Sequence, residues 1–128
     1  MIIDTSAIIA IFLKEPGVDK LIEKLGQAER AGVGVPTLTE TAIVLSARMG
    51  RDARAVLARF LQEGSITTVP FGDSHYGFAT DAWLRFGKGR HPAGLNFGDC
   101  MSYATARLAD EPLLCVGHDF AKTDLVLA

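Results

Sequence analysis

The sequence predicts an α/β fold in which short strands form a mostly parallel central sheet flanked by helices. Short apolar runs alternate with longer segments of helical spacing along the chain, as expected of repeated strand–helix units. The apolar runs are continuous, which is typical of parallel strands covered on both faces. The 128 residues are 48% hydrophobic and 22% charged, a composition that excludes a disordered chain and suits a single domain over residues 1–128.

The first half of the chain is predicted to contain two strands and four helices. Ser6 is expected to cap the first helix and Asp52 the fourth, because both residue types accept hydrogen bonds from helix N-termini. The first helix is apolar almost all round and should be buried, and Pro16 ends it. The predicted elements are, in order, a strand at 1–3, helices at 7–13 and 18–30, a short strand or extended segment at 32–36, a helix at 37–49, and a helix after Asp52 that includes residues 55–61.

The second half continues the alternation of strands and helices. Residues 65–71 alternate and are rich in Thr, Ile and Val, which indicates a strand. Several glycines and Pro92 indicate a loop between the two helices that follow. The predicted elements are, in order, a strand at 65–71, a helix at 73–86, a loop at 87–97, a helix at 98–109, a strand at 112–116, a turn at 120–123 and a strand at 125–127.

Charge and composition exclude several classes of protein. The chain has 13 Lys and Arg against 15 Asp and Glu, a formal net charge of −2, so it is not a uniformly basic nucleic-acid coat. Cys100 and Cys115 provide neither a disulfide framework nor the spacing of a zinc site. The apolar run at 7–13 lacks the basic start of a secretory signal, and no run approaches the roughly 20 residues that span a bilayer. We therefore expect a cytoplasmic protein.

Four acidic residues follow the ends of predicted strands or begin the next helices: Asp4, Glu40, Asp99 and Asp119. Sites in open α/β sheets form beyond the carboxyl ends of the strands, so these acids are expected to meet there. Like charges repel at close range, whereas a hard divalent cation such as Mg²⁺ or Mn²⁺ binds oxygen ligands and removes the repulsion. The pattern predicts metal-assisted hydrolysis of a phosphodiester.

Each of these acids also has a purely structural interpretation. Asp99 is suited to cap a helix, Asp4 and Asp119 to form turns, and Glu40 to interact with a helix dipole. The functional interpretation is favoured by their joint placement, and because Asp4 and Glu40 interrupt strongly apolar surroundings where a lone acid is expensive.

The loop before Asp99 carries a basic group at Arg85, Lys88 and Arg90. Such residues hold phosphates, and the glycines between them let a nucleic-acid backbone come close. Aromatic residues nearby could stack unpaired bases but are more often part of a core. The chain also has three histidines, His75, His91 and His118, which leave open a metal-independent histidine ribonuclease. A non-catalytic module that binds RNA or a partner is the third class.

Three segments carry a resemblance to a known family. The opening MIIDTSA (1–7) resembles that of PIN-domain ribonucleases, and the segment FGKGRHPAGLNFGDC (86–100) is similar to the signature of the VapC toxins of type II toxin–antitoxin modules. The segment GHDFAKTD (117–124) is similar to the VapC ending. The resemblance covers nearly the whole chain and implies a PIN-like three-layer fold.

The resemblance also implies an activity. It implies an endoribonuclease toxin dependent on Mg²⁺, with Mn²⁺ as a substitute, that is held inactive by a cognate VapB-type antitoxin and usually forms a homodimer. Asp4 and Asp99 match the firmest metal ligands of the family, and Glu40 matches its second acid. Asp119 is the first choice for the fourth acid, with Asp124 behind it. The implied substrates are RNAs such as transfer RNA or ribosomal RNA.

Overall fold

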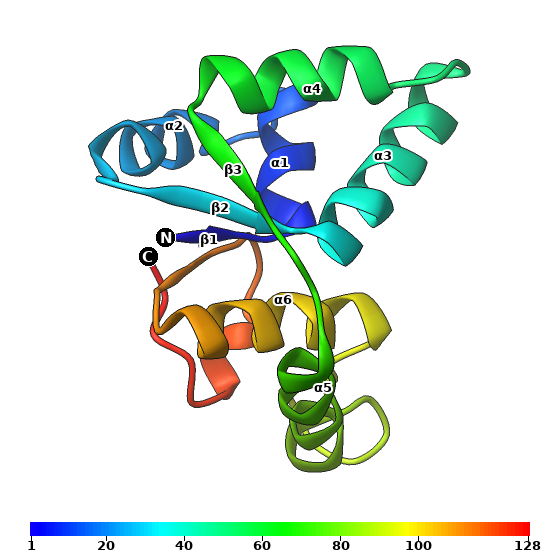
Figure 1. Ribbon diagram of the computed structural model, residues 1–128, viewed down its shortest axis with the longest axis vertical. Coiled ribbons are helices and arrows are strands. Elements are labelled where there is room, and N and C mark those ends of the chain that lie inside the picture. Colours follow the sequence, from blue (N-terminus) through cyan, green and yellow to red (C-terminus); the bar gives the residue numbers. More distant parts are fainter.

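A computed structural model describes residues 1–128 as three layers, with a parallel sheet between two groups of helices (Figure 1). The sheet has four strands in the order β3-β2-β1-β4, and every pairing is parallel. The α/β class and the three-layer arrangement are therefore confirmed. The elements are β1 (Ile2–Ile3), α1 (Thr5–Phe12), α2 (Val18–Gln27), β2 (Ala31–Gly34), α3 (Val35–Met49), α4 (Arg54–Glu63), β3 (Ile66–Val69), α5 (Asp73–Phe86), α6 (Phe97–Ala109), β4 (Leu113–Leu114) and the 3₁₀ turn η1 (Phe120–Lys122).

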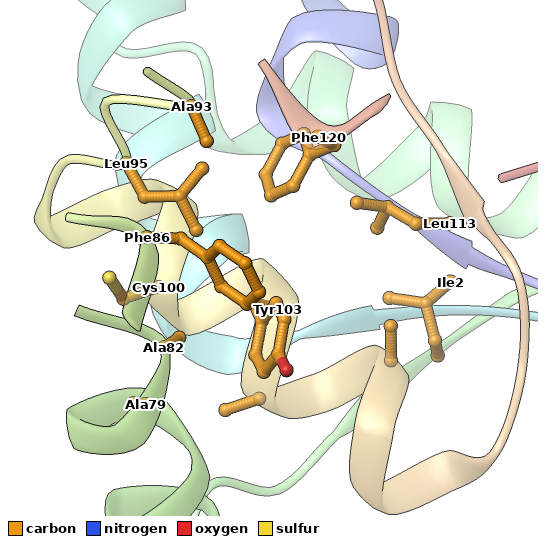
Figure 2. Close-up of a cluster of buried hydrophobic side chains, with 12 residues drawn as sticks. Ile2, Ala79, Ala82, Phe86, Ala93, Leu95, Cys100, Tyr103, Leu113 and Phe120 are labelled. Atoms are coloured by element: carbon orange, nitrogen blue, oxygen red, sulfur yellow. The ribbon is translucent and has the colours of Figure 1, made fainter. Parts of the chain in front are cut away.

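The two faces of the sheet bury separate hydrophobic cores. Successive side chains of a strand point to opposite faces, so Ile2 and Leu113 enter one core while Ile3 and Leu114 enter the other. Helices α1 to α4 cover the second core, and α5 and α6 cover the first, where Tyr103 lies among its apolar neighbours (Figures 1 and 2). Short strands are sufficient here because both faces are buried by helices.

The parallel sheet brings the carboxyl ends of its strands to one edge. Strand β1 lies between β2 and β4, with Ile2 opposite Gly32 and Leu113, and Ile3 opposite Leu114. The chain therefore leaves the sheet after β1, β2 and β4 on the same side, and the segments that follow these strands start close together.

Two predicted helix starts are corrected by the structure. Asp4, not Ser6, caps α1, and its carboxylate accepts a hydrogen bond from the Ser6 backbone N–H. Helix α3 begins at Val35, two residues early, since Pro36 is accommodated in a first helical turn that needs no proline N–H donor.

The other differences are also at the ends of elements. Ala53 is the capping position of α4, and the Asp52 carboxylate accepts from the Arg54 N–H beside it. Helix α2 ends at Gln27, and the predicted strands at 65–71 and 112–116 shorten to Ile66–Val69 and Leu113–Leu114. The expected strand at 125–127 is reduced to one bridge, between Leu127 and Leu113. None of the helices combines the length and the apolar character that a membrane span requires.

Candidate active site

The four predicted acids lie along the edge of the sheet at which the strands have their carboxyl ends. Asp4 follows β1, Glu40 lies in the second turn of α3 after β2, Asp99 lies in the first turn of α6, and Asp119 precedes η1 after β4. The structure thus brings residues from four separate segments to one edge.

The pKa of Asp99 reflects its burial and the presence of the other three acids nearby. The pKa of the Asp99 carboxyl is raised to about 6: burial is the largest cause, the negative charges of Asp4, Asp119 and Glu40 add to it, and a hydrogen bond from the Asn96 backbone opposes it. The helix cap is Asn96: its Oδ1 accepts from the Asp99 N–H at 2.9 Å, and the Asn96 N–H donates to Asp99 Oδ2 at 3.0 Å. Asp99 Oδ1 has no partner within the chain.

Asp4 is buried and held at both carboxylate oxygens. Asp4 is only 4% exposed to solvent. Oδ2 accepts from the Ser6 N–H at 3.0 Å and from the Ser6 hydroxyl at 2.6 Å, and Oδ1 accepts from the Ser102 hydroxyl at 2.6 Å. The carboxylate is satisfied by neutral donors, so its negative charge stays available to a cation.

Glu40 is fixed by hydroxyl groups and by a glycine. The Thr5 hydroxyl donates to Glu40 Oε1 at 2.6 Å, and the Thr41 hydroxyl, which donates to the Thr37 carbonyl at 2.8 Å, also lies 3.1 Å from Thr5 Oγ1. A Cβ at Gly98 would overlap the Glu40 carboxylate. Glycine at position 98 therefore lets the carboxylate lie against the first turn of α6, one residue from Asp99.

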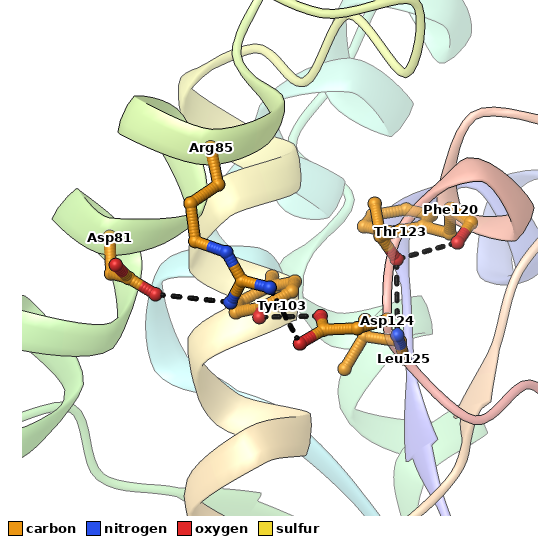
Figure 3. A network of polar contacts seen from close by, with 7 residues as sticks. All are labelled: Asp81, Arg85, Tyr103, Phe120, Thr123, Asp124 and Leu125. Atoms are coloured by element: carbon orange, nitrogen blue, oxygen red, sulfur yellow. Dashed lines mark hydrogen bonds and ion pairs between the residues drawn. The ribbon is translucent and has the colours of Figure 1, made fainter.

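Asp119 and Asp124, the two candidates for the fourth acid, have different surroundings. Asp119 is exposed, and its charge acts on Asp99. Asp124 accepts from the Tyr103 hydroxyl at 2.7 Å and pairs with Arg85 at 3.1 Å (Figure 3). Although burial opposes it, these two contacts hold the pKa of Asp124 below its usual value. The geometry favours Asp119 at the acidic edge and gives Asp124 a structural role.

None of the four acids forms an ion pair with a basic group of the chain. No three His, Cys, Asp or Glu side chains lie close enough together to hold an ion by themselves. This arrangement fits Mg²⁺, which usually binds through one or two carboxylates and keeps several of its waters. The donor set, made only of carboxylate oxygens, also suits Mn²⁺.

The predicted basic residues differ in how far they are engaged. Arg85 contacts Asp81 at 3.4 Å and Asp124 at 3.1 Å, and its guanidinium lies 4.7 Å from the centre of the Phe86 ring. The Arg90 guanidinium lies 4.8 Å from the centre of the Trp83 ring, and its Nε donates to a backbone carbonyl. The exposed Lys88 side chain forms no ion pair.

Two of the three histidines have structural contacts instead of a shared site. His75 is buried against the Phe71 ring, and its Nδ1 accepts from the Gly72 N–H. His91 packs edge-on against Phe86, and its Nδ1 accepts from a backbone N–H. These contacts give the histidine ribonuclease no supporting geometry.

The sequence reasoning missed three hydroxyl residues behind the acids: Ser102, Thr37 and Thr41. All three are fully buried, and their hydroxyls connect to Asp4 or, through Thr5, to Glu40. A signal was available for Ser102, because residues three apart on a helix share a face, and Ser102 is three residues after Asp99.

Comparison with known proteins identifies the family. The PIN domain family matches residues 1–126. VapC ribonuclease Mb2004c of Mycobacterium bovis and ribonuclease VapC36 of Mycobacterium tuberculosis are each 45% identical over 126 residues, which is 98% of this chain and 91% of each relative. Ribonuclease VapC of Mycolicibacterium smegmatis is 38% identical over 125 residues, 98% of this chain and 97% of that relative.

Solved structures agree on the fold. Mycobacterium tuberculosis VapC20, a sarcin–ricin loop cleaving toxin, superposes with a TM-score of 0.78 at 17% identity, covering 99% of this chain and 97% of that one. A toxin–antitoxin complex from Klebsiella pneumoniae gives a TM-score of 0.73 at 16% identity, covering 99% and 95%. The full-length sequence relatives and the shared fold lead to one conclusion: this chain belongs to the PIN-domain family and, within it, to the VapC ribonucleases.

Proposed function

We propose that this protein is a divalent-metal-dependent endoribonuclease that acts as the toxin of a toxin–antitoxin system. The observation that carries the proposal is the placement of four acids along one sheet edge with no basic partner, where burial and the charges of the other three raise the pKa of Asp99. Such repulsion is unfavourable in the isolated chain, and a bound cation relieves it.

Asp4 and Asp99 are the proposed ligands of Mg²⁺, with Mn²⁺ as a substitute, and Glu40 and Asp119 complete or orient the set. When bound, the cation lowers the pKa of a coordinated water and stabilises charge on the phosphate. The Ser6 and Ser102 hydroxyls hold the Asp4 carboxylate, and the Thr5 hydroxyl holds Glu40. Asp99 must lose its proton before it can serve as a ligand, so its raised pKa makes metal binding dependent on pH.

RNA is the proposed substrate, held along the loop that precedes α6. Lys88 and Arg90 are the first candidates for contacts with the RNA backbone, since each is exposed and unpaired with an acid. Arg85 ranks behind them because Asp81 and Asp124 already engage its guanidinium. Structured RNAs with accessible loops, such as transfer RNA or ribosomal RNA, are the proposed targets.

A VapB-type antitoxin and a second copy of the chain are the proposed protein partners, and the cytoplasm is the proposed location. The solved toxin–antitoxin complex with this fold supports the first partner. A groove of about 530 Å³ between α5 and α6 supports the second, because exposed apolar surfaces of this kind mark association sites. Tyr76 and Phe97 on its rim are 71% and 80% exposed.

Cleavage of total RNA by purified, antitoxin-free protein tests the proposal. Reactions contain Mg²⁺, Mn²⁺ or EDTA, and an Asp99→Asn variant provides the control. We expect discrete fragments with either metal, and none with EDTA or with the variant. Cleavage that survives both would point to the histidines, whereas RNA binding without cleavage under any condition would support the non-catalytic module.

A further inference from the structure

We infer that Ser102 is a positioning residue that fixes the Asp4 carboxylate for the metal, an inference that rests on the proposed function. Ser102 lies on α6, one turn after Asp99, and its hydroxyl donates to Asp4 Oδ1 at 2.6 Å across 98 residues of sequence. Through Ser102, helix α6, which carries the proposed ligand Asp99, holds the other proposed ligand, Asp4.

The hydrogen bonds around Ser102 run in one direction. A serine hydroxyl has a single proton, and Ser102 gives it to Asp4. In the 3.1 Å contact between the Thr37 and Ser102 hydroxyls, Thr37 must therefore be the donor. Helix α3 thus supports α6, and α6 supports the carboxylate. Both hydroxyl residues are almost completely buried, at 1% and 0% exposure, so solvent does not compete for these contacts.

The two oxygens of Asp4 are not held equally. Oδ2 has two donors, the N–H and the hydroxyl of Ser6, and the Ser6 oxygen accepts in turn from the Val116 N–H at 2.9 Å. Oδ1 has one donor, Ser102. Removing the Ser102 hydroxyl leaves Oδ1 without a donor on a buried side chain, and the carboxylate is then held from one side only.

Loss of this contact should weaken metal binding without removing a ligand. Outer-shell partners that orient a metal ligand typically change affinity by about 10- to 100-fold when they are mutated. We expect Ser102→Ala to weaken Mn²⁺ binding within this range. The kcat for RNA cleavage at saturating Mn²⁺ should recover most of the wild-type value, because the reacting groups themselves are intact.

Isothermal titration of Mn²⁺ into the full-length, antitoxin-free protein tests the inference. Ser102→Cys accompanies Ser102→Ala, since a thiol fills the site but donates weakly. Thr105→Ala is the matched control: Thr105 is also buried on α6, but its hydroxyl donates to the Met101 carbonyl. We expect weaker binding in both Ser102 variants and wild-type affinity in the control. Thermal unfolding in EDTA verifies that all variants fold.

Three results would overturn the inference, and they are distinguishable. Wild-type protein that binds Mn²⁺, with both Ser102 variants within about twofold of its affinity, would refute the role of Ser102 alone. Wild-type protein that neither binds Mn²⁺ nor cleaves RNA would refute the proposed function and this inference with it. Equal weakening in Thr105→Ala would also count against Ser102, because the effect would then not depend on contact with Asp4.

Discussion

Replacing Asp99 by asparagine should stabilise the metal-free protein while removing its activity. Burial and three neighbouring acids raise the pKa of Asp99 to about 6, so at neutral pH the folded chain holds a carboxylate in an unfavourable place. Asparagine keeps the shape and can still accept from the Asn96 N–H through its amide oxygen, but it carries no charge. The variant therefore removes the repulsion without removing the helix cap, which Asn96 provides.

The size of the gain follows from the difference between the folded and the ordinary pKa. A pKa of about 6 against 3.8 corresponds to about 3 kcal/mol at neutral pH. Asp99 is partly exposed, so solvent screening reduces this to about 1–2 kcal/mol. For a chain of 128 residues, 1 kcal/mol shifts the melting temperature by about 4 °C, so we expect a rise of about 4–8 °C.

The gain must also depend on pH in a defined direction. Above pH 6 the wild-type carboxylate is charged in both the folded and unfolded states, and the full penalty is present. As the pH falls from about 6 towards 3.8, the folded state takes up a proton first, and the penalty disappears. The advantage of Asp99→Asn should therefore fall by about half at pH 5.

Differential scanning calorimetry in EDTA at pH 7.5 and pH 5 measures both effects. Added Mg²⁺ should raise the melting temperature of the wild type more than that of the variant, since only the wild type retains this ligand. An Asp99→Asn variant that melts at or below the wild-type temperature at pH 7.5 in EDTA would refute the electrostatic reasoning.

Three further substitutions probe the site and the surfaces around it. Gly98→Ala should displace the Glu40 carboxylate and slow RNA cleavage by about 10- to 100-fold, whereas Gly77→Ala, where a Cβ meets open space, should leave the rate unchanged. Tyr103→Phe removes a hydrogen bond to the C-terminal segment and should lower the free energy of unfolding in urea by about 1–2 kcal/mol, and an unchanged midpoint would contradict this role. Tyr76→Glu, at a 71% exposed position, should shift the proposed dimer towards monomer in light scattering after gel filtration, and an unaltered mass would contradict the proposed role of α5 in an interface.

Local patterns were enough to predict most of the fold. The apolar first helix is buried, and the alternation of strands and helices gives the parallel sheet, because both follow from burial alone. The prediction that Ser6 caps α1 was wrong, because Asp4 and Ser6 are equally good caps by residue type. In the structure Asp4 caps the helix, and the Ser6 N–H and hydroxyl both donate to its carboxylate.

Some contacts of the candidate site depend on tertiary packing and cannot be predicted from local sequence patterns. The placement of Asp4 and Asp99 follows from the topology of the sheet, which the sequence pattern predicts. The partners of Arg85 do not follow from any local pattern, because Asp124 lies 39 residues away and its contact depends on how the C-terminal segment packs on α5 and α6 (Figure 3). Arg85 is predicted to contact phosphate, and the structure shows in addition that its guanidinium pairs with Asp124 of the same chain.

The chemistry of the RNA ends tests the central claim most directly. Total RNA is cleaved by the purified protein in Mg²⁺. The fragments are then sequenced by a method in which adaptors join only to a 5′-phosphate or to a 3′-hydroxyl, so that the chemistry of each end is identified. In the proposed mechanism water attacks phosphorus and the 3′ oxygen leaves, which gives a 5′-phosphate and a 3′-hydroxyl, and no 2′,3′-cyclic phosphate forms because the RNA 2′-hydroxyl takes no part. We predict these ends, and their absence in EDTA. A 2′,3′-cyclic phosphate, or the same fragments in EDTA, would contradict the metal-dependent mechanism.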